Sequence, residues 1–201
     1  TSLQEAESLY AQSEDPMFLA GGHTLLPTMK QRLNAPTDLI DLAGVSELTG
    51  ISKDGDVLTI GAYTRHADVA ASEIVQAAIP ALAKLARGIG DAQVRNRGTL
   101  GGSVANNDPA ADYPAALLGL GATVVTTKRT VSADEFFVDM FETVLAEGEI
   151  ITAVTFPVAG DAAYVKFANP AARYARVGVF INRHDAGVRV AIKCAASSVF
   201  S

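Results

Sequence analysis

Residues 96–112 form the most informative segment of the sequence, Asn96-Arg-Gly-Thr-Leu-Gly-Gly-Ser-Val-Ala-Asn-Asn-Asp-Pro-Ala-Ala-Asp112. A glycine pair lies here among hydroxyl, amide and carboxylate side chains. Such a stretch can present successive backbone N–H groups as an anion-binding nest, together with neutral groups suited to diphosphate, ribityl and amide moieties. A polar surface loop with Asx-turns is the alternative, but Leu100 and Val104 indicate burial beside the polar groups.

The surrounding segment, residues 88–114, shows no sustained helical or strand period. Structureless loops of this length are uncommon inside compact domains and are usually functional or disordered. Val94, Leu100, Val104 and Tyr113 provide apolar anchors. The pattern therefore predicts an ordered loop that wraps a ligand.

A second glycine segment occurs earlier, at Phe18-Leu-Ala-Gly-Gly-His-Thr-Leu-Leu-Pro27. It indicates a strand, a double glycine and the start of a helix, where free N–H groups and the helix dipole favour an anion. His23 and Thr24 could add side-chain donors. An ordinary strand–turn–helix connection with Thr24 as N-cap explains the same pattern.

Other nucleotide and catalytic motifs are absent from the sequence. The pair Gly119-Leu-Gly121 follows a predicted helix and precedes a strand, which is the wrong polarity for a Rossmann fingerprint. Neither a Walker sequence nor a GxSxG nucleophile elbow occurs. The two glycine segments therefore indicate a phosphate cradle in another architecture.

Composition narrows the function classes further. The chain has 201 residues, of which 49% are apolar and 19% charged, and its net charge is -6. These values argue against disorder and against a general nucleic-acid surface. One cysteine, Cys194, excludes an internal disulfide or a thiolate cluster built by this chain alone, and three scattered histidines argue against a metal site. No signal peptide or spanning segment is evident, so we expect a cytoplasmic protein.

Capping and periodicity predict an α+β chain. Helices are expected from the Ser2 capping box, at 24–33, 64–70, 73–87 with an interruption at Pro80, 114–120, and from Ser132. Strands are expected at 17–19, 38–42, 57–60, 122–127, 149–156 and 164–167, with a hairpin of 177–182 and 188–194. Residues 1–157 would form one mixed unit and 158–201 the start of a second module, with residues missing at both ends.

Together the two glycine segments resemble those of the FAD-binding medium subunit of the molybdenum hydroxylases, of the carbon monoxide dehydrogenase and xanthine dehydrogenase type. Ala20-Gly-Gly-His-Thr24 resembles the first FAD loop of that family, and Asn96–Ser103 through Asp108–Asp112 resembles the second. Thr59-Ile-Gly-Ala62 with Thr64 is similar to a third family feature. The resemblance extends from Ser2 to Phe200.

This resemblance implies a two-subdomain FAD-binding fold of the vanillyl-alcohol oxidase and MurB type over residues 1–157. Residues 158–201 would begin an incomplete C-terminal sheet-plus-helix domain. The resemblance also implies FAD as the cofactor and assigns a set of cofactor-binding residues. These are Ala20, Gly21, Gly22, His23, Thr24, Thr99, Leu100, Gly101, Gly102, Ser103, Asn106, Asp108, Asp112, Ile151, Lys166 and Tyr174.

Specific roles follow from the resemblance for part of this set. Residues 20–24 and 99–103 would hold the diphosphate, and Asp112 would lie near the ribityl or adenosine part. Ile151 would lie against the isoalloxazine, or is a strand core residue. Tyr174 would cover a flavin face, or is a tyrosine at the solvent edge. Lys166 would lie near the pyrimidine end of the flavin, or is a surface lysine.

The implied function is electron transfer. FAD would accept electrons from [2Fe–2S] clusters in a partner subunit, which receives them from a molybdopterin-binding large subunit, and an external acceptor such as NAD, a quinone or oxygen would take them. A dimer of heterotrimers is implied, and no side chain of this chain is expected to act as acid, base, nucleophile or metal ligand. The alternatives are a self-contained flavoenzyme of the MurB or alcohol oxidase type, and a cofactor-free assembly subunit.

Overall fold

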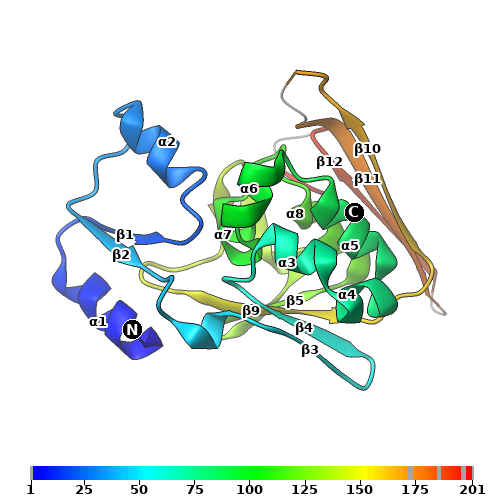
Figure 1. Cartoon of the computed structure of the whole chain (residues 1–201), viewed down its shortest axis with the longest axis horizontal. Coiled ribbons are helices and arrows are strands. Elements are labelled where there is room, and N and C mark those ends of the chain that lie inside the picture. The colour runs from blue at the N-terminus through cyan, green and yellow to red at the C-terminus, as the bar shows by residue number, and fades with distance from the viewer. Residues whose placement is uncertain (1, 172–173, 185–186, 196–197, 201) are drawn as a thin grey trace.

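The N-terminal layer is built around a short parallel strand pair. The computed structural model describes residues 2–171, 174–184, 187–195 and 198–200. Helix α1 (Leu3–Gln12) begins where the Ser2 hydroxyl accepts from the Glu5 N–H at 3.1 Å, as the capping box predicts. Strands β1 (Pro16–Leu19) and β2 (Asp38–Asp41) pair in parallel, with α2 (Leu25–Lys30) between them in sequence. A small buried cluster, which includes Ala6, Ile40 and Leu48 of the 3₁₀ turn Ser46–Leu48, supports this layer at the left of Figure 1.

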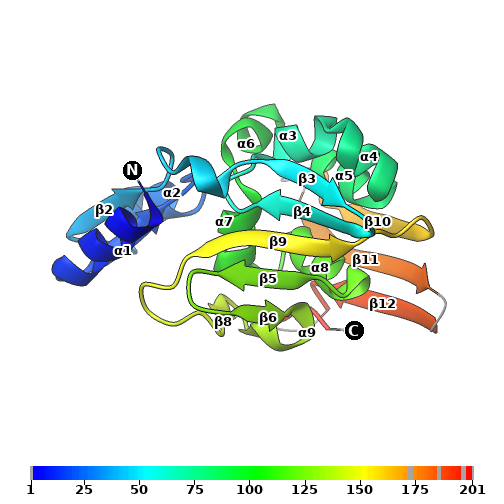
Figure 2. The same ribbon diagram turned by 90° about the horizontal axis from the view of Figure 1, so that it is seen from below.

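A five-stranded antiparallel sheet forms the centre of the molecule. Its order is β3 (Ile51–Asp54), β4 (Val57–Gly61), β9 (Ile151–Pro157), β5 (Thr123–Thr126) and β6 (Thr130–Ser132). Inward residues such as Ile60, Val124 and Val154 are buried and alternate with more exposed neighbours, because helices cover only one face. Figure 2 shows the open face toward the viewer, with the helices behind it.

The covering helices supply most of the main core. They are α3 (His66–Ala71), α4 (Glu73–Ala78), α5 (Pro80–Arg87) and α8 (Tyr113–Leu120). Pro80 occupies the first turn of α5, where a proline costs no helical hydrogen bond, so the interruption predicted at this residue is confirmed. Every residue of α8 is buried, because this helix lies between the central sheet and the C-terminal strands.

The C-terminal strands form a separate antiparallel sheet. Strands β10 (Ala162–Ala168), β11 (Ala175–His184) and β12 (Gly187–Lys193) follow one another in space as in sequence. The predicted hairpin is confirmed, with its turn residues 185–186 outside the described residues. Tyr164 and Phe180 belong to the same buried cluster as α5 and α8, so this sheet shares the main core. The small elements α9 (Ala133–Phe136), β7 (Phe137–Asp139) and β8 (Glu142–Thr143) lie beside α8 and α7.

The prediction of one long loop over 88–114 is wrong. Two short helices lie there, α6 (Ala92–Arg97) and α7 (Leu100–Asn106). The Asp91 carboxylate caps α6 through the Val94 N–H at 2.9 Å, and the Thr99 hydroxyl caps α7. Helices of six or seven residues span too few turns to show a period, and the glycines within α7 lower its helix propensity. Their stability therefore comes from capping and packing.

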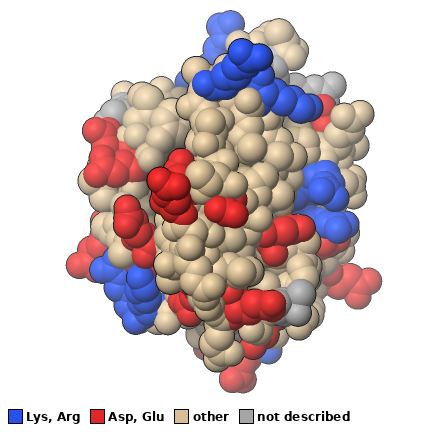
Figure 3. Space-filling model, turned by 90° about the vertical axis from the view of Figure 1, so that its left-hand side faces the viewer, with Lys and Arg blue, Asp and Glu red and all other residues tan. Residues whose placement is uncertain are grey.

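Smaller differences occur elsewhere. Helix α2 ends at Lys30, and the Thr24 side chain makes no capping hydrogen bond. Strand β3 was not predicted. It lies at the edge of the sheet and its last three residues, 52–54, are exposed, so its sequence shows no apolar alternation. None of the described helices has the length and apolar character required to cross a membrane. The face that carries the N-terminal layer has acidic groups spread over its middle and lower part, and basic groups at its upper end, its right-hand edge and its lower left (Figure 3).

Gly119 allows α8 to approach β11 closely. A Cβ atom at this position would lie 2.6 Å from Phe180 Cδ1 and 3.3 Å from Phe180 Cβ, inside the core. We expect Gly119→Ala to lower the free energy of unfolding by about 1–3 kcal/mol, the usual cost of overpacking. Thermal unfolding followed by circular dichroism measures this change. Gly160→Ala is the matched control, since a Cβ atom there meets nothing within 4 Å, and equal melting temperatures for the two variants would contradict the packing argument.

Candidate cofactor site

A cavity of about 680 Å³ lies between the N-terminal layer and the main body. Its size is in the range of small-molecule and cofactor pockets. Among the predicted site residues, Leu100 is fully buried in the main core and does not line the cavity. The others do line it, namely Ala20, Gly21, Gly22, His23, Thr24, Thr99, Gly101, Gly102, Ser103, Asn106, Asp108, Asp112, Ile151, Lys166 and Tyr174.

The two glycine segments touch each other. A Cβ atom at Gly21 would lie 2.2 Å from the carbonyl oxygen of Arg97 and 2.8 Å from Gly98 Cα, so only glycine permits this contact. Gly22 adopts a φ of +72°, which favours glycine in the turn before α2. Segments distant in sequence thus form one continuous wall of the cavity.

Free backbone donors lie in the first segment. Within the described part of the chain, the N–H groups of residues 21–24 donate to no protein acceptor. The amides of 100–103 differ from the predicted nest, because each has a protein acceptor. Their acceptors are the Thr64 carbonyl at 3.0 Å, the Ala62 carbonyl at 2.8 Å, the Thr99 hydroxyl at 3.2 Å and the Thr99 carbonyl at 3.1 Å. An anion would therefore meet its backbone donors at 21–24.

The end of β4 holds the second segment in place. Arg65 and Thr99 form a β-bridge, which the backbone bonds of the neighbouring residues extend on both sides. A Cβ atom at Gly101 would lie 2.5 Å from Ala62 Cβ, so this glycine permits close packing against the residue after β4. A Cβ atom at Gly102 would instead lie 2.8 Å from the Thr99 hydroxyl oxygen. The third sequence feature, Thr59–Ala62 with Thr64, thus supports the second.

His66 is a buried neutral group in the wall. Its side chain lies near the Tyr113 ring, with 5.4 Å between the centroids. Among the described residues, neither His66 Nδ1 nor the Tyr113 hydroxyl has a hydrogen-bond partner. Burial lowers the pKa of His66 to about 4, although the Asp112 carboxylate acts to raise this pKa. The ring is therefore uncharged at neutral pH. Burial likewise raises the pKa of Tyr113.

Asp112 lies at the opposite end of the wall, beside the C-terminal sheet. Its carboxylate accepts from Lys166 Nζ at 2.8 Å, from Lys193 Nζ at 2.9 Å and from the Tyr164 hydroxyl. Burial and then the negative charge of Asp112 raise the pKa of Tyr164, so this hydroxyl stays protonated. Lys166 is not a free surface lysine, because its Nζ also donates to the Gly88 carbonyl at 2.8 Å.

Ile151 and Tyr174 differ in their surroundings. Ile151 is 5% exposed at the first position of β9, where it belongs to the main core and also lines the cavity. Tyr174 is 58% exposed at the cavity rim, and its carbonyl accepts from the Asn169 N–H at 2.7 Å. Both positions are compatible with the two interpretations that the sequence allows for each.

Several lining residues escaped the sequence analysis. Glu149 is buried, yet hydrogen bonds from Arg129, the Ala146 N–H and Thr126 outweigh desolvation and lower its pKa to about 2. Asn107 does not line the cavity, but its side-chain amide holds the β7–β8 turn by donating to two carbonyls there. Other missed lining residues include Tyr63, His66 and Phe141. Of these, His66 alone had a local signal, since it follows the Thr64 feature in the sequence.

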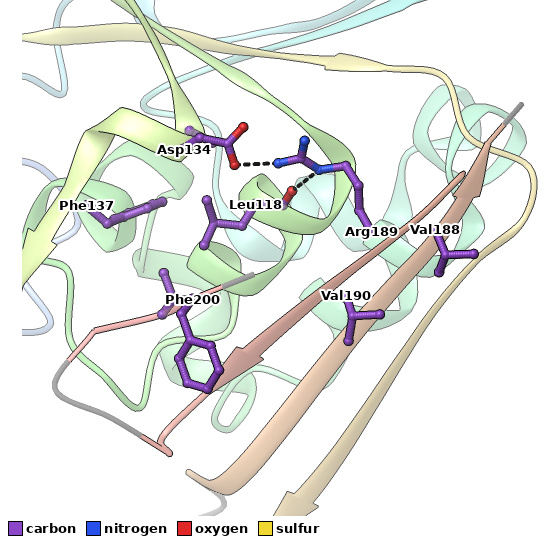
Figure 4. Close-up of a pocket in the computed structure, with 9 residues that line it drawn as sticks. Leu118, Asp134, Phe137, Val188, Arg189, Val190 and Phe200 are labelled. Carbon is purple, nitrogen blue, oxygen red and sulfur yellow. Dashed lines mark hydrogen bonds and ion pairs between the residues drawn. The ribbon is translucent and has the colours of Figure 1, made fainter. Parts of the chain in front are cut away.

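A second hollow, of about 580 Å³, lies between α8, α9 and β12. Figure 4 shows Arg189 reaching from β12 to the Leu118 carbonyl and to Asp134. Its other labelled residues are apolar. Within the described ranges, no group of three or more His, Cys, Asp or Glu side chains could hold a metal ion.

Comparison with known proteins identifies the family. Residues 1–159 match the family model described as the FAD binding domain in molybdopterin dehydrogenase. The chain belongs to this family. Its cofactor is accordingly FAD, and it is an oxidoreductase subunit.

Individual relatives agree with this family over nearly the whole chain. The carbon monoxide dehydrogenase medium chain of Hydrogenophaga pseudoflava is 39% identical over 98% of this chain and 72% of its own length. The nicotine 6-hydroxylase medium subunit of Paenarthrobacter nicotinovorans is 38% identical over 98% of this chain and 74% of its own length. A solved structure of the Hydrogenophaga pseudoflava carbon monoxide dehydrogenase superimposes with a TM-score of 0.94 at 38% identity, covering 99% of this chain and 74% of that one. The fold beyond residue 159 is thus shared as well.

The cavity of this FAD-binding domain fits its cofactor chemically. FAD carries a diphosphate, and the four amides of 21–24 without protein acceptors match a group rich in hydrogen-bond acceptors. The glycines let the backbone approach closely. Neutral hydroxyl and amide side chains in the second segment match the uncharged parts of the cofactor.

Gly21→Ala tests the contact between the two glycine segments. Because its Cβ would overlap the Arg97 carbonyl, residues 21–24 must move from the wall, and we expect FAD affinity to fall by about tenfold or more, which corresponds to one lost charge-assisted hydrogen bond. Quenching of FAD fluorescence on titration measures the dissociation constant. Gly160→Ala should keep wild-type affinity, and wild-type affinity in Gly21→Ala would contradict the assignment of this wall.

His66 predicts a pH dependence of stability. The unfolded chain binds a proton at His66 near pH 6.5 that the folded chain binds only near pH 4, so the free energy of unfolding should fall as pH drops through this window. The largest slope for one group is about 1.4 kcal/mol per pH unit. Urea unfolding at pH 7, 6, 5 and 4 measures it. His66→Asn should be less stable at pH 7 and show a shallower slope, whereas a slope equal to that of wild type would show that another group titrates.

Proposed function

We propose that this chain is the electron-transfer flavoprotein subunit of a molybdenum hydroxylase. FAD supplies one- and two-electron redox chemistry, and the protein supplies binding, orientation and exclusion of water. The observation that carries the proposal is that residues 21–24 line a cavity of cofactor size and that their amides have no acceptor in the part of the chain that the structure describes. Electrons would come from [2Fe–2S] clusters of a partner subunit and leave to NAD, a quinone or oxygen.

The proposed binding roles follow the geometry of the two segments. The amides of 21–24, with the side chains of His23 and Thr24, hold the diphosphate. Residues 99–103 continue the same wall, and the amides of 100–103 are not available to the cofactor because they are already bonded within the protein. Asn106, Asp108 and Asp112 offer polar groups to the ribityl or adenosine part.

The flavin ring itself would lie toward the C-terminal sheet. Ile151 and Tyr174 are proposed to flank it, one as a buried wall and the other as an exposed cover. Lys166 is proposed at the pyrimidine end of the ring. These roles require no proton transfer by the protein, which suits a subunit that passes electrons and does not act on the substrate.

The division of the chain follows the same proposal. Residues 1–157 would constitute the FAD-binding domain, with two subdomains of the vanillyl-alcohol oxidase and MurB type, and 158–201 would begin the next domain. The two buried clusters, one around Ala6 and Ile40 and one around α8, support two subdomains.

The proposed partners are an iron–sulfur subunit and a molybdopterin-binding large subunit, arranged as a dimer of heterotrimers. Relatives are named as medium chains or medium subunits, which supports an assembly of this kind. The single cysteine of this chain also supports an external cluster, because [2Fe–2S] centres need several ligands.

Copurification tests the proposal. A tagged copy of the full chain, expressed in its native host, should retain FAD and bring down two further chains together with iron and molybdenum. Absorption spectra and metal analysis of the purified complex measure these contents. A preparation that holds FAD but no iron, and whose flavin is reduced by a small substrate of its own, would identify a self-contained flavoenzyme. A preparation that refuses added FAD would identify an assembly subunit.

A further inference from the structure

Lys193 lies outside the matched family segment 1–159, yet its side chain reaches the cofactor site. In the C-terminal sheet, Lys166 of β10 pairs with Gly178 of β11, and Gly178 pairs with Lys193 of β12. Residues directly opposite each other on neighbouring strands project from the same face. The two lysines therefore converge from one row of the sheet on the same carboxylate, that of Asp112.

The contacts of Lys193 match a fully used ammonium group. Nζ donates to the carbonyls of Ala110 and Ala111 at 2.6 and 2.8 Å and forms an ion pair with Asp112 at 2.9 Å. An ammonium has three N–H donors, whereas a neutral amine has two. The side chain is 1% exposed, and although burial lowers its pKa, the Asp112 charge acts in the opposite direction. Three acceptors from three consecutive residues bind one cation, so the whole segment 110–112 is held to β12.

Gly178 provides the space that this arrangement needs. A Cβ atom at Gly178 would lie 2.7 Å from the Tyr164 hydroxyl oxygen and 2.9 Å from Lys193 Cε. Because φ at Gly178 is not in the left-handed region, the glycine is needed for space and not for its backbone conformation. The absence of a side chain at Gly178 thus leaves room for the Lys193 side chain and the Tyr164 hydroxyl to reach Asp112.

We propose that Lys193 is a positioning residue for the FAD site, which acts by holding residues 110–112 against the cavity wall. Ala110, Ala111 and Asp112 all line the cavity, whereas Lys193 does not. Its effect on the cofactor is therefore indirect. This inference rests on the proposed FAD site and makes the C-terminal sheet part of it.

Lys193→Met tests the proposal in the full chain. The substitution keeps an unbranched stem but removes all three donors, so segment 110–112 loses its anchor and the dissociation constant for FAD should rise by about tenfold or more. Arg189→Met is the matched control. Arg189 also projects from β12 and bonds to α8 and Asp134, but it faces the second hollow, so this variant should lose stability and keep wild-type FAD affinity.

Gly178→Ala tests the same anchor without removing a charge. Its Cβ should displace the Lys193 stem and weaken FAD binding, whereas Gly160→Ala should not, and this pair decides the question if Lys193→Met does not fold. Fluorescence titration measures the dissociation constants, and circular dichroism measures the melting temperatures. Melting temperatures that fall while affinity stays at the wild-type value in Lys193→Met and Gly178→Ala would assign these residues a merely structural role and overturn the proposal. A wild-type chain that binds no FAD would refute the proposed function instead.

Discussion

The contact between Gly21 and the backbone at residues 97–98 is the constraint on which the cofactor cavity depends. It joins the N-terminal layer to the main body where a side chain of any size would separate them. Residues 21–24 belong to the cavity lining beside this contact. Four neighbouring amides that have no acceptor among the described residues suit a ligand that accepts hydrogen bonds.

The walls of the cavity are supported from three distant parts of the chain. The end of β4 bonds to the segment before and within α7, which fixes the second glycine segment. Helix α8 lies fully buried behind that segment and carries Asp112 at its N-terminal cap. Strands β10 and β12 hold this carboxylate through Lys166 and Lys193. The family segment 1–159 thus provides most of the lining, and the following strands provide an anchor.

The sequence alone predicts the parts of this site that have local signals. Paired glycines between apolar runs identified both segments, and alternation identified the central strands. Helices α6 and α7 escaped because short capped helices show no period. The sequence also did not show that the free backbone donors lie at 21–24 and not at 100–103. The amides of residues 100–103 are used by carbonyls at 62 and 64 and by Thr99, and the first two are partners that only tertiary structure reveals. Lys193 escaped for the same reason, because the pairing register with Gly178 and Lys166 cannot be read from one sequence.

Satisfied polar groups around the cavity have a consequence for binding. Asp112, Glu149 and Asn107 each have their acceptors or donors engaged by protein groups, so they do not need to reorganise when a ligand enters. His66 remains uncharged, so it adds no charge that must be screened. Ligand affinity then depends on the amides of 21–24, and because the polar groups around them are already bonded within the protein, less free energy is lost in ordering the site. In a site of this kind, affinity for the ligand falls most when a residue that holds the lining in place, such as Lys193, is removed, even though that residue does not touch the ligand.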